Sequence, residues 1–233
     1  MSFSDIHLIG CGGTGTALAP ALARLAAYHD LANEASFNLW DGDIFEAHNL
    51  TRQVCGEAHT DQNKAEITQA LMAAQGLIAN AHTRYATADA LEQRLGDCPL
   101  VIPSVDNDAT RAMTLRVLSR REGPFFWISP GNNDNSDGQN RISCSVLWWG
   151  RLDGVEVGID PRQLYANLAE PDDDIPGSGG CMEHAPSVPQ LITANALAAV
   201  LTLTVIQNLL DGKLPARSSS AVMDGRTLKL SFF

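Results

Sequence analysis

The sequence predicts an α/β fold in which a doubly wound, mostly parallel sheet is flanked by helices and followed by a C-terminal antiparallel extension. Short apolar runs alternate with helix-forming segments over the first 130 residues, as in parallel α/β sheets. A glycine-rich turn follows the first apolar run directly. The remainder carries polar loops, one long helix and a hairpin pattern, which predict the extension.

The elements of the parallel part are expected in strict alternation. Its strands are short apolar runs, and its helices carry alanine and leucine at near-helical spacing. Asp61 is predicted to cap its helix and Gly76 to lie near the end. The predicted order is strand Ile6–Ile9, helix Ala17–Ala27, strand Ser36–Trp40, helix Asp61–Leu77, strand Thr83–Ala86, helix Ala88–Leu95, strand Leu100–Pro103, helix Ala109–Arg121 and strand Pro124–Ser129.

The pattern changes after residue 130. A polar loop rich in Asn, Asp and Gly is followed by a strand, a loop-rich acidic stretch, a long helix and two strands. The predicted bounds are loop Pro130–Asn140, strand Ile142–Trp149, loop-rich Arg151–Gly180, helix Ser187–Leu210 and hairpin Ser219–Asp224 with Thr227–Phe232. With no repeat or low-complexity linker, residues 1–233 are expected to form one domain, with parts 1–130 and 131–233.

The composition is that of a globular protein and excludes several function classes. Hydrophobic residues make up 45% and charged residues 18%, which excludes disordered and coiled-coil classes. The net charge of −11 disfavours a nucleic-acid-coating role, because such proteins need a basic surface. The apolar stretch Leu191–Leu210 carries polar residues such as Asn195 and Thr202, so a buried helix is favoured over a membrane span.

The cysteines and the N-terminus predict a reducing compartment. Five widely spaced cysteines are an odd number, and no two form a Cys-x-x-Cys pair, which disfavours a disulfide framework or a zinc ribbon. The N-terminal residues lack the basic start and apolar run of a signal peptide. We therefore expect a cytoplasmic protein without a membrane partner.

The first candidate site is the turn Gly10-Cys11-Gly12-Gly13-Thr14-Gly15, which fits G-x-G-x-x-G between a strand and a helix. Gly10, Gly12, Gly13 and Gly15 permit a tight turn and close approach of the backbone to phosphate, and the helix N-terminus supplies N–H donors. Asp41 ends the second strand, where an acidic residue accepts bonds from ribose hydroxyls. The turn predicts a nucleotide site, against the alternative of a ligand-free glycine turn.

Two cationic residues after that strand favour an enzyme that cleaves ATP over one that binds a dinucleotide. Arg52 and Lys64 follow Asp41 closely in the chain. Enzymes that break the α–β bond of ATP need cations for the pyrophosphate leaving group, whereas a dinucleotide oxidoreductase does not. Either residue alone would be read as a solvated surface cation.

These motifs together resemble the ThiF/MoeB/HesA family, the bacterial relatives of ubiquitin-activating enzymes. The resemblance covers residues 5 to about 130 and, more faintly, the stretch from Cys181 through the long helix. Within this family the sequence resembles the ThiF-type member of the PRTRC gene cassette. The motifs that carry it are Gly10–Gly15, Asp41-Gly-Asp43, Asn49-Leu-Thr-Arg52-Gln53, Lys64 and Val105-Asp106-Asn107-Asp108-Ala-Thr-Arg111.

The resemblance implies a Rossmann-like fold and a set of roles around Mg·ATP. Asp41, with Asp43 beside it, would bind the ribose, and Arg52 and Lys64 would contact the phosphates. Asn49 and Gln53 would position the triphosphate. Asp106, with Asn107 beside it, would hold Mg²⁺ near the α-phosphate, as hard oxygen ligands do. An N-cap role is the alternative for Asp106.

Cys181 is the candidate nucleophile. It follows a Pro-Gly-Ser-Gly-Gly stretch before the long helix, where the family places its catalytic cysteine. A thiolate near a helix N-terminus has a lowered pKa and accepts activated acyl groups, and His184 is a candidate proton acceptor. The alternative is a buried packing cysteine, which is the interpretation of Cys11, Cys55, Cys98 and Cys144.

Two family features have no counterpart in the sequence. The family's N-terminal extension carries an arginine that reaches the partner subunit's ATP, and this sequence starts almost at its first strand. The family's zinc-binding cysteine pairs are also missing. Both departures put full adenylating activity in doubt.

The predicted function is ATP-dependent adenylation of the C-terminal carboxylate of a small ubiquitin-like or sulfur-carrier protein, with transfer to Cys181 as a further step. The resemblance also implies a homodimer. Two alternatives stay open: a catalytically reduced ATP-binding scaffold of a multi-gene cassette, and an NAD-dependent oxidoreductase, which Arg52, Lys64 and Asp106 disfavour.

Overall fold

The computed structural model describes residues 2–132, 143–177, 192–215, 218–225, 227 and 229–233. Its strands are β1 Asp5–Ile9, β2 Ser36–Trp40, β3 Asn80–His82, β4 Pro99–Pro103, β5 Phe125–Asn132, β6 Ser143–Leu152, β7 Val155–Gly158, β8 Ser220–Asp224 and β9 Lys229–Phe232. Its helices are α1 Gly13–Tyr28, α2 Leu31–Glu34, α3 Lys64–Ala73, α4 Ala88–Glu92, α5 Asp108–Ser119, α6 Ala166–Ala169 and α7 Ile192–Leu210.

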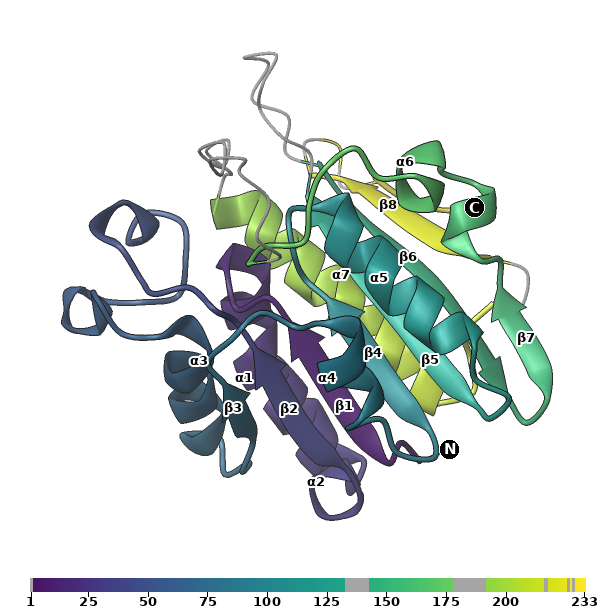
Figure 1. The fold of residues 1–233 in the computed structure, drawn as a ribbon, viewed down its shortest axis with the longest axis horizontal. Coiled ribbons are helices and arrows are strands. Elements are labelled where there is room, and N and C mark those ends of the chain that lie inside the picture. The colour runs from purple at the N-terminus through teal and green to yellow at the C-terminus, as the bar shows by residue number, and fades with distance from the viewer. Residues whose placement is uncertain (1, 133–142, 178–191, 216–217, 226, 228) are drawn as a thin grey trace.

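Within these residues, nine strands form one sheet in the order β3-β2-β1-β4-β5-β6-β8-β9, with β7 paired to β6 (Figure 1). The pairs from β3 to β5 are parallel, and the pairs that involve β6, β8 or β9 are antiparallel. The predicted fold class, a doubly wound parallel sheet with an antiparallel extension, is confirmed.

The strand order places a topological switch beside β1. From β1 the chain moves outward to β2 and β3, then crosses back to β4 on the other side. Ile9 pairs with Trp40 of β2 and Pro103 of β4, so the three strands end at the same level. Doubly wound sheets bind ligands in the crevice at such a point, and this edge faces upward in Figure 1.

Helices cover both faces of the sheet and divide the core in two. One buried cluster joins α1, α3 and α7 to the sheet, and the other joins α4, α5 and α6 to the opposite face (Figure 1). The parallel strands are largely apolar, as is common for strands buried on both sides, with Asp5, His7 and Asn38 as buried polar exceptions. Trp127 of β5 is fully buried, and its indole N–H donates to Thr114 of α5 at 2.9 Å.

The long helix α7 packs inside the fold. It lies against α1, β5 and β6, and its buried residues include Asn195 and Thr202, in accord with the buried helix that the sequence predicts. In the described part of the chain, α7 is the one helix long and apolar enough to cross a membrane, but half of that stretch is buried in the protein. Length and composition are weak evidence for a span, since core helices pass the same test.

The structure corrects several element boundaries. The strand β5 continues to Asn132, where a loop was expected from Pro130, because these residues pair with β6. Asp61 does not cap α3; it has a left-handed φ of 64°, and the cap is Asn63, whose side-chain oxygen accepts from the backbone N–H groups of Ala65 and Glu66. The amide can reach both donors because Asn63 directly precedes the helix. The third strand is Asn80–His82, and Thr83–Ala86 is a loop, because only the earlier segment lies level with β2.

The stretch Arg151–Gly180, expected to be loop-rich, contains β7 and α6 in its described part. Both were missed because they are only four residues long, which is too short for periodicity to reveal. The hairpin at the C-terminus is confirmed as β8 and β9, which pair from Ala221↔Phe232 to Asp224↔Lys229.

Candidate functional site

The glycine-rich turn joins β1 to α1, and its glycines serve different purposes. Gly10 has a φ of 90°, and a Cβ there would lie 2.6 Å from the carbonyl oxygen of Ser104. A Cβ on Gly15 would lie 2.1 Å from the carbonyl oxygen of Gly10. These two positions therefore need glycine for the turn itself. Gly12 has open space, with Gln53 Nε2 the nearest atom at 3.9 Å, so a ligand can approach its backbone closely.

The N-terminus of α1 is suited to an anion. The helix is 16 residues long, none of the described side chains caps it, and its first turn holds no acidic residue. Its first N–H groups are therefore not taken up by an internal carboxylate. Uncapped helix N-termini bind phosphate through these donors and the helix dipole.

Asp41 at the end of β2 is bonded to this turn. Its Oδ2 accepts from the backbone N–H of Cys11 at 2.7 Å, and its Oδ1 accepts from the backbone N–H of Asp43 at 2.8 Å. Burial raises the pKa of Asp41 to about 6, although the nearby Lys64 ammonium works in the opposite direction. A carboxylate that is desolvated yet held by backbone donors is poised to accept from further hydroxyl groups.

Asp43 lies between a cation and a phenol. Lys64 Nζ lies 3.0 Å from Asp43 Oδ2, and the hydroxyl of Tyr85 donates to Asp43 Oδ1. Burial and the bond to Asp43 raise the pKa of Tyr85, and the charges of Asp41 and Asp106 add to that shift. Asp43 is therefore the acidic side chain in direct contact with this phenol, and Lys64 is its cationic partner.

The segment between β2 and α3 carries the other predicted phosphate contacts. Asn49 is buried, and its side-chain oxygen accepts from the backbone N–H of Glu46 at 3.0 Å, so it stabilises the turn. The N–H groups of Arg52 and Gln53 both donate to the carbonyl oxygen of Asn49. Gln53 is 8% exposed, and its Oε1 is buried with no hydrogen-bond partner in the described residues. The atom of this amide nearest to a Cβ built on Gly12 is the donor Nε2, at 3.9 Å, so Gln53 adjoins the open space at the turn.

Asp106 follows β4, and another residue caps the next helix. The cap of α5 is Asn107, whose side-chain oxygen accepts from the backbone N–H of Thr110 at 2.8 Å. Asp106 is exposed, so the capping alternative does not account for it. Arg111 donates to the carbonyl oxygen of Val105 at 2.6 Å and so steadies the main chain next to Asp106. The side-chain oxygen of Asn107 is used in this cap, so the predicted contact of Asn107 with a nucleotide has to leave that hydrogen bond in place.

The described residues contain no group of three or more His, Cys, Asp and Glu able to hold a metal ion by themselves. Mg²⁺ commonly binds through one or two carboxylates together with substrate phosphates and water. Asp106 is exposed, and its carboxylate is of the type that fits that donor set. This residue therefore suits a cation brought by a nucleotide.

Two residues near the site carried no role in the sequence-based prediction. Tyr85 contacts Asp43, and its ring occupies the space where Gly42 and Gly177 would each carry a Cβ, 2.8 Å away. Asn195 of α7 is 1% exposed and bonds the glycine-rich turn and the main chain of Arg52. The one signal for Asn195 was a polar residue in a largely apolar helix, a signal that it shares with residues such as Thr202 and Gln207, while nothing local distinguishes Tyr85.

The predicted nucleophile Cys181 and its neighbour His184 lie outside the described residues. The four cysteines that are described are free thiols. Cys11 and Cys144 are buried in the core, and burial raises the pKa of Cys144 to about 11. Burial likewise raises the pKa values of Cys11, Cys55 and Cys98, so these thiols are poor nucleophiles.

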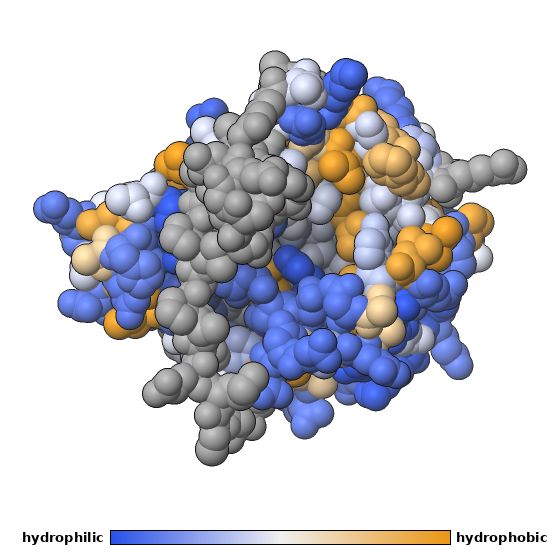
Figure 2. All heavy atoms as spheres, turned by 90° about the horizontal axis from the view of Figure 1, so that it is seen from above, coloured by the Kyte–Doolittle hydropathy of each residue, from blue (hydrophilic) through white to orange (hydrophobic). Residues whose placement is uncertain are grey.

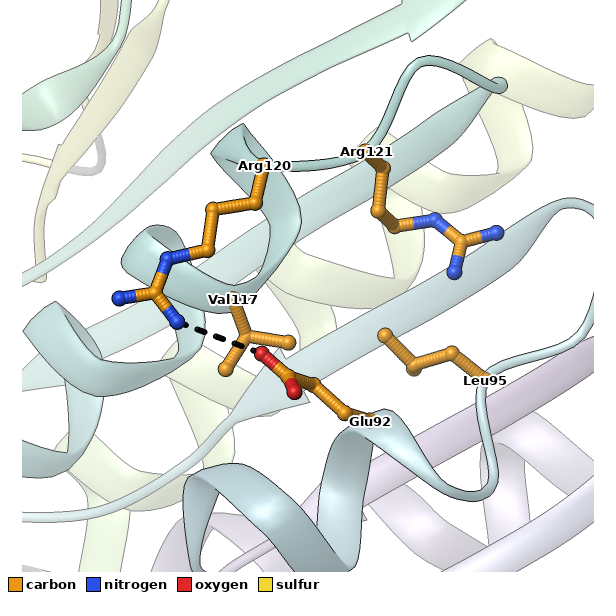
Figure 3. Close-up of a pocket in the computed structure, with 5 residues that line it drawn as sticks. All are labelled: Glu92, Leu95, Val117, Arg120 and Arg121. Atoms are coloured by element: carbon orange, nitrogen blue, oxygen red, sulfur yellow. Dashed lines mark hydrogen bonds and ion pairs between the residues drawn. The ribbon is translucent and has the colours of Figure 1, made fainter.

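Figure 2 views the edge of the sheet that carries the site, and hydrophilic residues dominate the left and the lower right of that view. A separate pocket of about 390 Å³ lies elsewhere, lined by Glu92, Leu95, Val117, Arg120 and Arg121. Figure 3 shows Arg120 turned toward Glu92, with which it forms an ion pair at 3.5 Å. This pocket adjoins the C-terminal end of α5, about 18 Å along the helix from its beginning near Asp106, so it is distinct from the site.

Comparisons with known proteins bear on the fold and the family of this chain. In solved structures, E. coli MccB with ATP is similar at 16% identity and a TM-score of 0.62, over 99% of this chain and 63% of that one. E. coli MccB with AMPCPP and MccA is 15% identical with a TM-score of 0.65, over 99% of this chain and 63% of that one. PaaA is 15% identical with a TM-score of 0.61, over the same shares of the two chains. The chain thus spans under two thirds of the length of these proteins, and the likeness shows the fold.

No curated protein matches the sequence. Residues 1–130 match the ThiF family, and this span contains the glycine-rich turn, Asp41, the segment with Arg52, Lys64 and Asp106. More than half of the chain is therefore covered by one family pattern, and the resemblance noted in the sequence is confirmed. The chain belongs to the ThiF family.

Proposed function

We propose that this protein adenylates the C-terminal carboxylate of a small protein or peptide, using Mg·ATP. The observation that carries the proposal is the bond from Cys11 N–H to Asp41, with Lys64 beside the same carboxylates. It joins an uncapped helix N-terminus, a ribose acceptor and a cation at the end of β1 and β2. That combination suits a nucleoside triphosphate.

The chemistry divides among these residues. The α1 N-terminus and Gly12 bind phosphate, and Asp41 accepts from the ribose. A carboxylate oxygen of the partner attacks the α-phosphorus, the bond to the β-phosphate breaks, and pyrophosphate leaves as an acyl-adenylate forms. Arg52 and Lys64 stabilise the charge that develops on the leaving group. Asp106 would hold Mg²⁺, which neutralises phosphate charge when bound.

The partner is proposed to be a small ubiquitin-like or sulfur-carrier protein, or a peptide. MccB has been solved with ATP and with MccA, which supports a nucleotide together with a peptide substrate in this fold. The proposed homodimer and the PRTRC assignment rest on the resemblance of the sequence, and the proposed cytoplasmic location rests on the cysteine pattern.

Transfer to Cys181 is proposed as a second step. The thiolate would attack the acyl carbon, form a thioester and release AMP, with the thiol proton passing to a base such as His184. Cys181 follows Gly177 by four residues in the sequence. Gly177 lies beside the ring of Tyr85, since a Cβ built on it would be 2.8 Å from that ring, and Tyr85 donates to Asp43; this neighbourhood supports the proposal.

ATP–pyrophosphate exchange tests the proposal. The purified chain is mixed with Mg·ATP, labelled pyrophosphate and small carrier proteins or peptides with free C-termini. Exchange that depends on the C-terminal carboxylate, is lost in Asp106→Ala and persists in Cys181→Ala would support adenylation with a separate thiol step. Asp89→Ala, an exposed acidic residue of α4, serves as the matched control and should leave exchange unchanged.

The same experiment separates the alternatives. ATP binding without exchange for any carrier would favour a scaffold that has lost the chemistry. Tight binding of NADH in place of ATP would overturn the proposal in favour of an oxidoreductase. Exchange in Asp106→Ala at the wild-type rate would remove Asp106 from the catalytic set.

A further inference from the structure

Asn195 connects three segments that are far apart in the sequence. Its Nδ2 donates to the carbonyl oxygen of Arg52 at 3.2 Å, and its Oδ1 accepts from the hydroxyl of Thr14 at 3.3 Å. The same oxygen accepts from the side-chain amide of Asn132 at the end of β5. The side chain is 1% exposed, so these bonds are made out of contact with bulk water, where each is costly to lose.

The packing of Asn195 against the turn explains why position 13 is a glycine. A Cβ on Gly13 would lie 2.1 Å from Asn195 Nδ2 and 3.2 Å from the carbonyl oxygen of Arg52. Gly13 therefore leaves room for α7 to pack directly on the turn, which differs from the role of Gly12. The long C-terminal helix thus forms one wall of the proposed nucleotide site.

We propose that Asn195 is a positioning residue of the adenylation reaction: it holds the main chain at Arg52 at a set distance from the glycine-rich turn. The inference rests on the proposed function. The turn binds the phosphates and Arg52 acts on the leaving group, so their relative placement sets how well the transition state is stabilised. A residue acting through Arg52 changes kcat more than KM for ATP.

An amide is the side chain that can serve all three partners. It offers a donor for a carbonyl oxygen and an acceptor for a hydroxyl and a second amide. Alanine removes both functions and leaves the carbonyl oxygen of Arg52 without this donor. Serine is one atom shorter, so its hydroxyl does not reach Arg52. Neither change alters a residue that contacts ATP in the proposed mechanism.

The test is a double-mutant cycle on the full chain, with exchange measured over a range of ATP concentrations. The variants are Asn195→Ala, Arg52→Ala and the double substitution. Thr202→Val is the matched control, because Thr202 is a fully buried polar residue of the same helix that bonds only to Ala198 in the described residues. Thermal unfolding of each variant shows that it is folded, and Asn195→Ser replaces Asn195→Ala if the latter does not fold.

We expect Asn195→Ala to lower kcat between about tenfold and a hundredfold, with KM for ATP changed by less than about threefold. In the Arg52→Ala background the same substitution should lower kcat by less than about twofold, because the group it positions is gone. Thr202→Val should keep the wild-type kcat.

Other outcomes overturn the inference. If the Asn195 and Arg52 effects multiply, or Thr202→Val loses as much activity as Asn195→Ala, Asn195 has only a structural role. If the Asn195→Ala variant keeps the wild-type kcat, Asn195 has no role in catalysis. A wild-type chain that binds ATP but shows no exchange with any carrier fails at the proposed function itself, and the inference falls with it.

Discussion

The carboxylate of Asp41 accepts a hydrogen bond from the backbone N–H of Cys11 at 2.7 Å, and this bond joins the end of β2 to the glycine-rich turn after β1. Both groups are buried. The bond spans 30 positions of the sequence, and it orients the acidic side chain and the phosphate-binding turn relative to each other. Burial also raises the pKa of Asp41, and this shift should make the stability of the protein depend on pH.

The stability of the protein should depend on the ionisation of Asp41. Its pKa is about 6 in the folded state and about 3.9 in an unfolded chain. Between these values the folded state binds the extra proton, so stability falls as pH rises from about 4 to about 6 and is level above. The expected loss is up to about 3 kcal/mol. Urea unfolding across this range should show a steeper fall for wild type than for Asp41→Asn, and equal slopes would contradict the assignment.

Adjacent glycines of the turn should respond differently to alanine. Gly13→Ala places a Cβ 2.1 Å from Asn195 Nδ2, so the protein should lose about 1–3 kcal/mol of unfolding free energy through overpacking. Gly12→Ala meets no atom closer than 3.9 Å, so it should fold with little loss while its methyl group impedes phosphate binding. Thermal unfolding and ATP titration of both variants test this. A Gly12→Ala protein that binds ATP as tightly as wild type would count against the site.

Removing the charge of Lys64 should affect chemistry more than stability. Its ammonium pairs with Asp43; the Lys64 side chain is 11% exposed and that of Asp43 46%, so Lys64→Met should lower the unfolding free energy by about 1–2 kcal/mol. The rate of pyrophosphate exchange should fall by about a hundredfold or more. Lys213→Met is the control, because Lys213 is an exposed lysine that pairs with Asp211. A similar loss of exchange in both variants would argue against a direct role for Lys64.

The carboxylate of Asp173 should stabilise α5. It accepts from the backbone N–H groups of Asp108 and Ala109, both at 2.7 Å, and so satisfies two donors at the helix N-terminus. Asp173→Ala should lower the unfolding free energy by about 1 kcal/mol. Asp172→Ala, a neighbouring exposed acidic residue, should have little effect. Equal urea midpoints for wild type and Asp173→Ala would show that water replaces the carboxylate without cost.

Local signals in the sequence were sufficient for the architecture and for the motif that carries the family. The strand Ser36–Trp40 was predicted with its observed bounds. Polar and apolar residues alternate from Ser36 to Leu39, and this alternation is typical of a strand. The α3 start was wrong because Asp61 and Asn63 are both good caps in isolation. Only the chain path decides that Asn63 also donates to the carbonyl oxygens of Asp41 and Asp43.

The candidate site shows the same division. Residue type, order along the chain and the family resemblance led to the proposed roles of Gly12, Asp41, Lys64 and Asp106, and these roles stay predictions. Residue type and order could not distinguish a glycine needed for the turn from one that admits a neighbour, since that depends on which atoms pack against it. Asn195 lies 181 residues from Thr14, so its contact with the turn exists only once α7 has packed on α1.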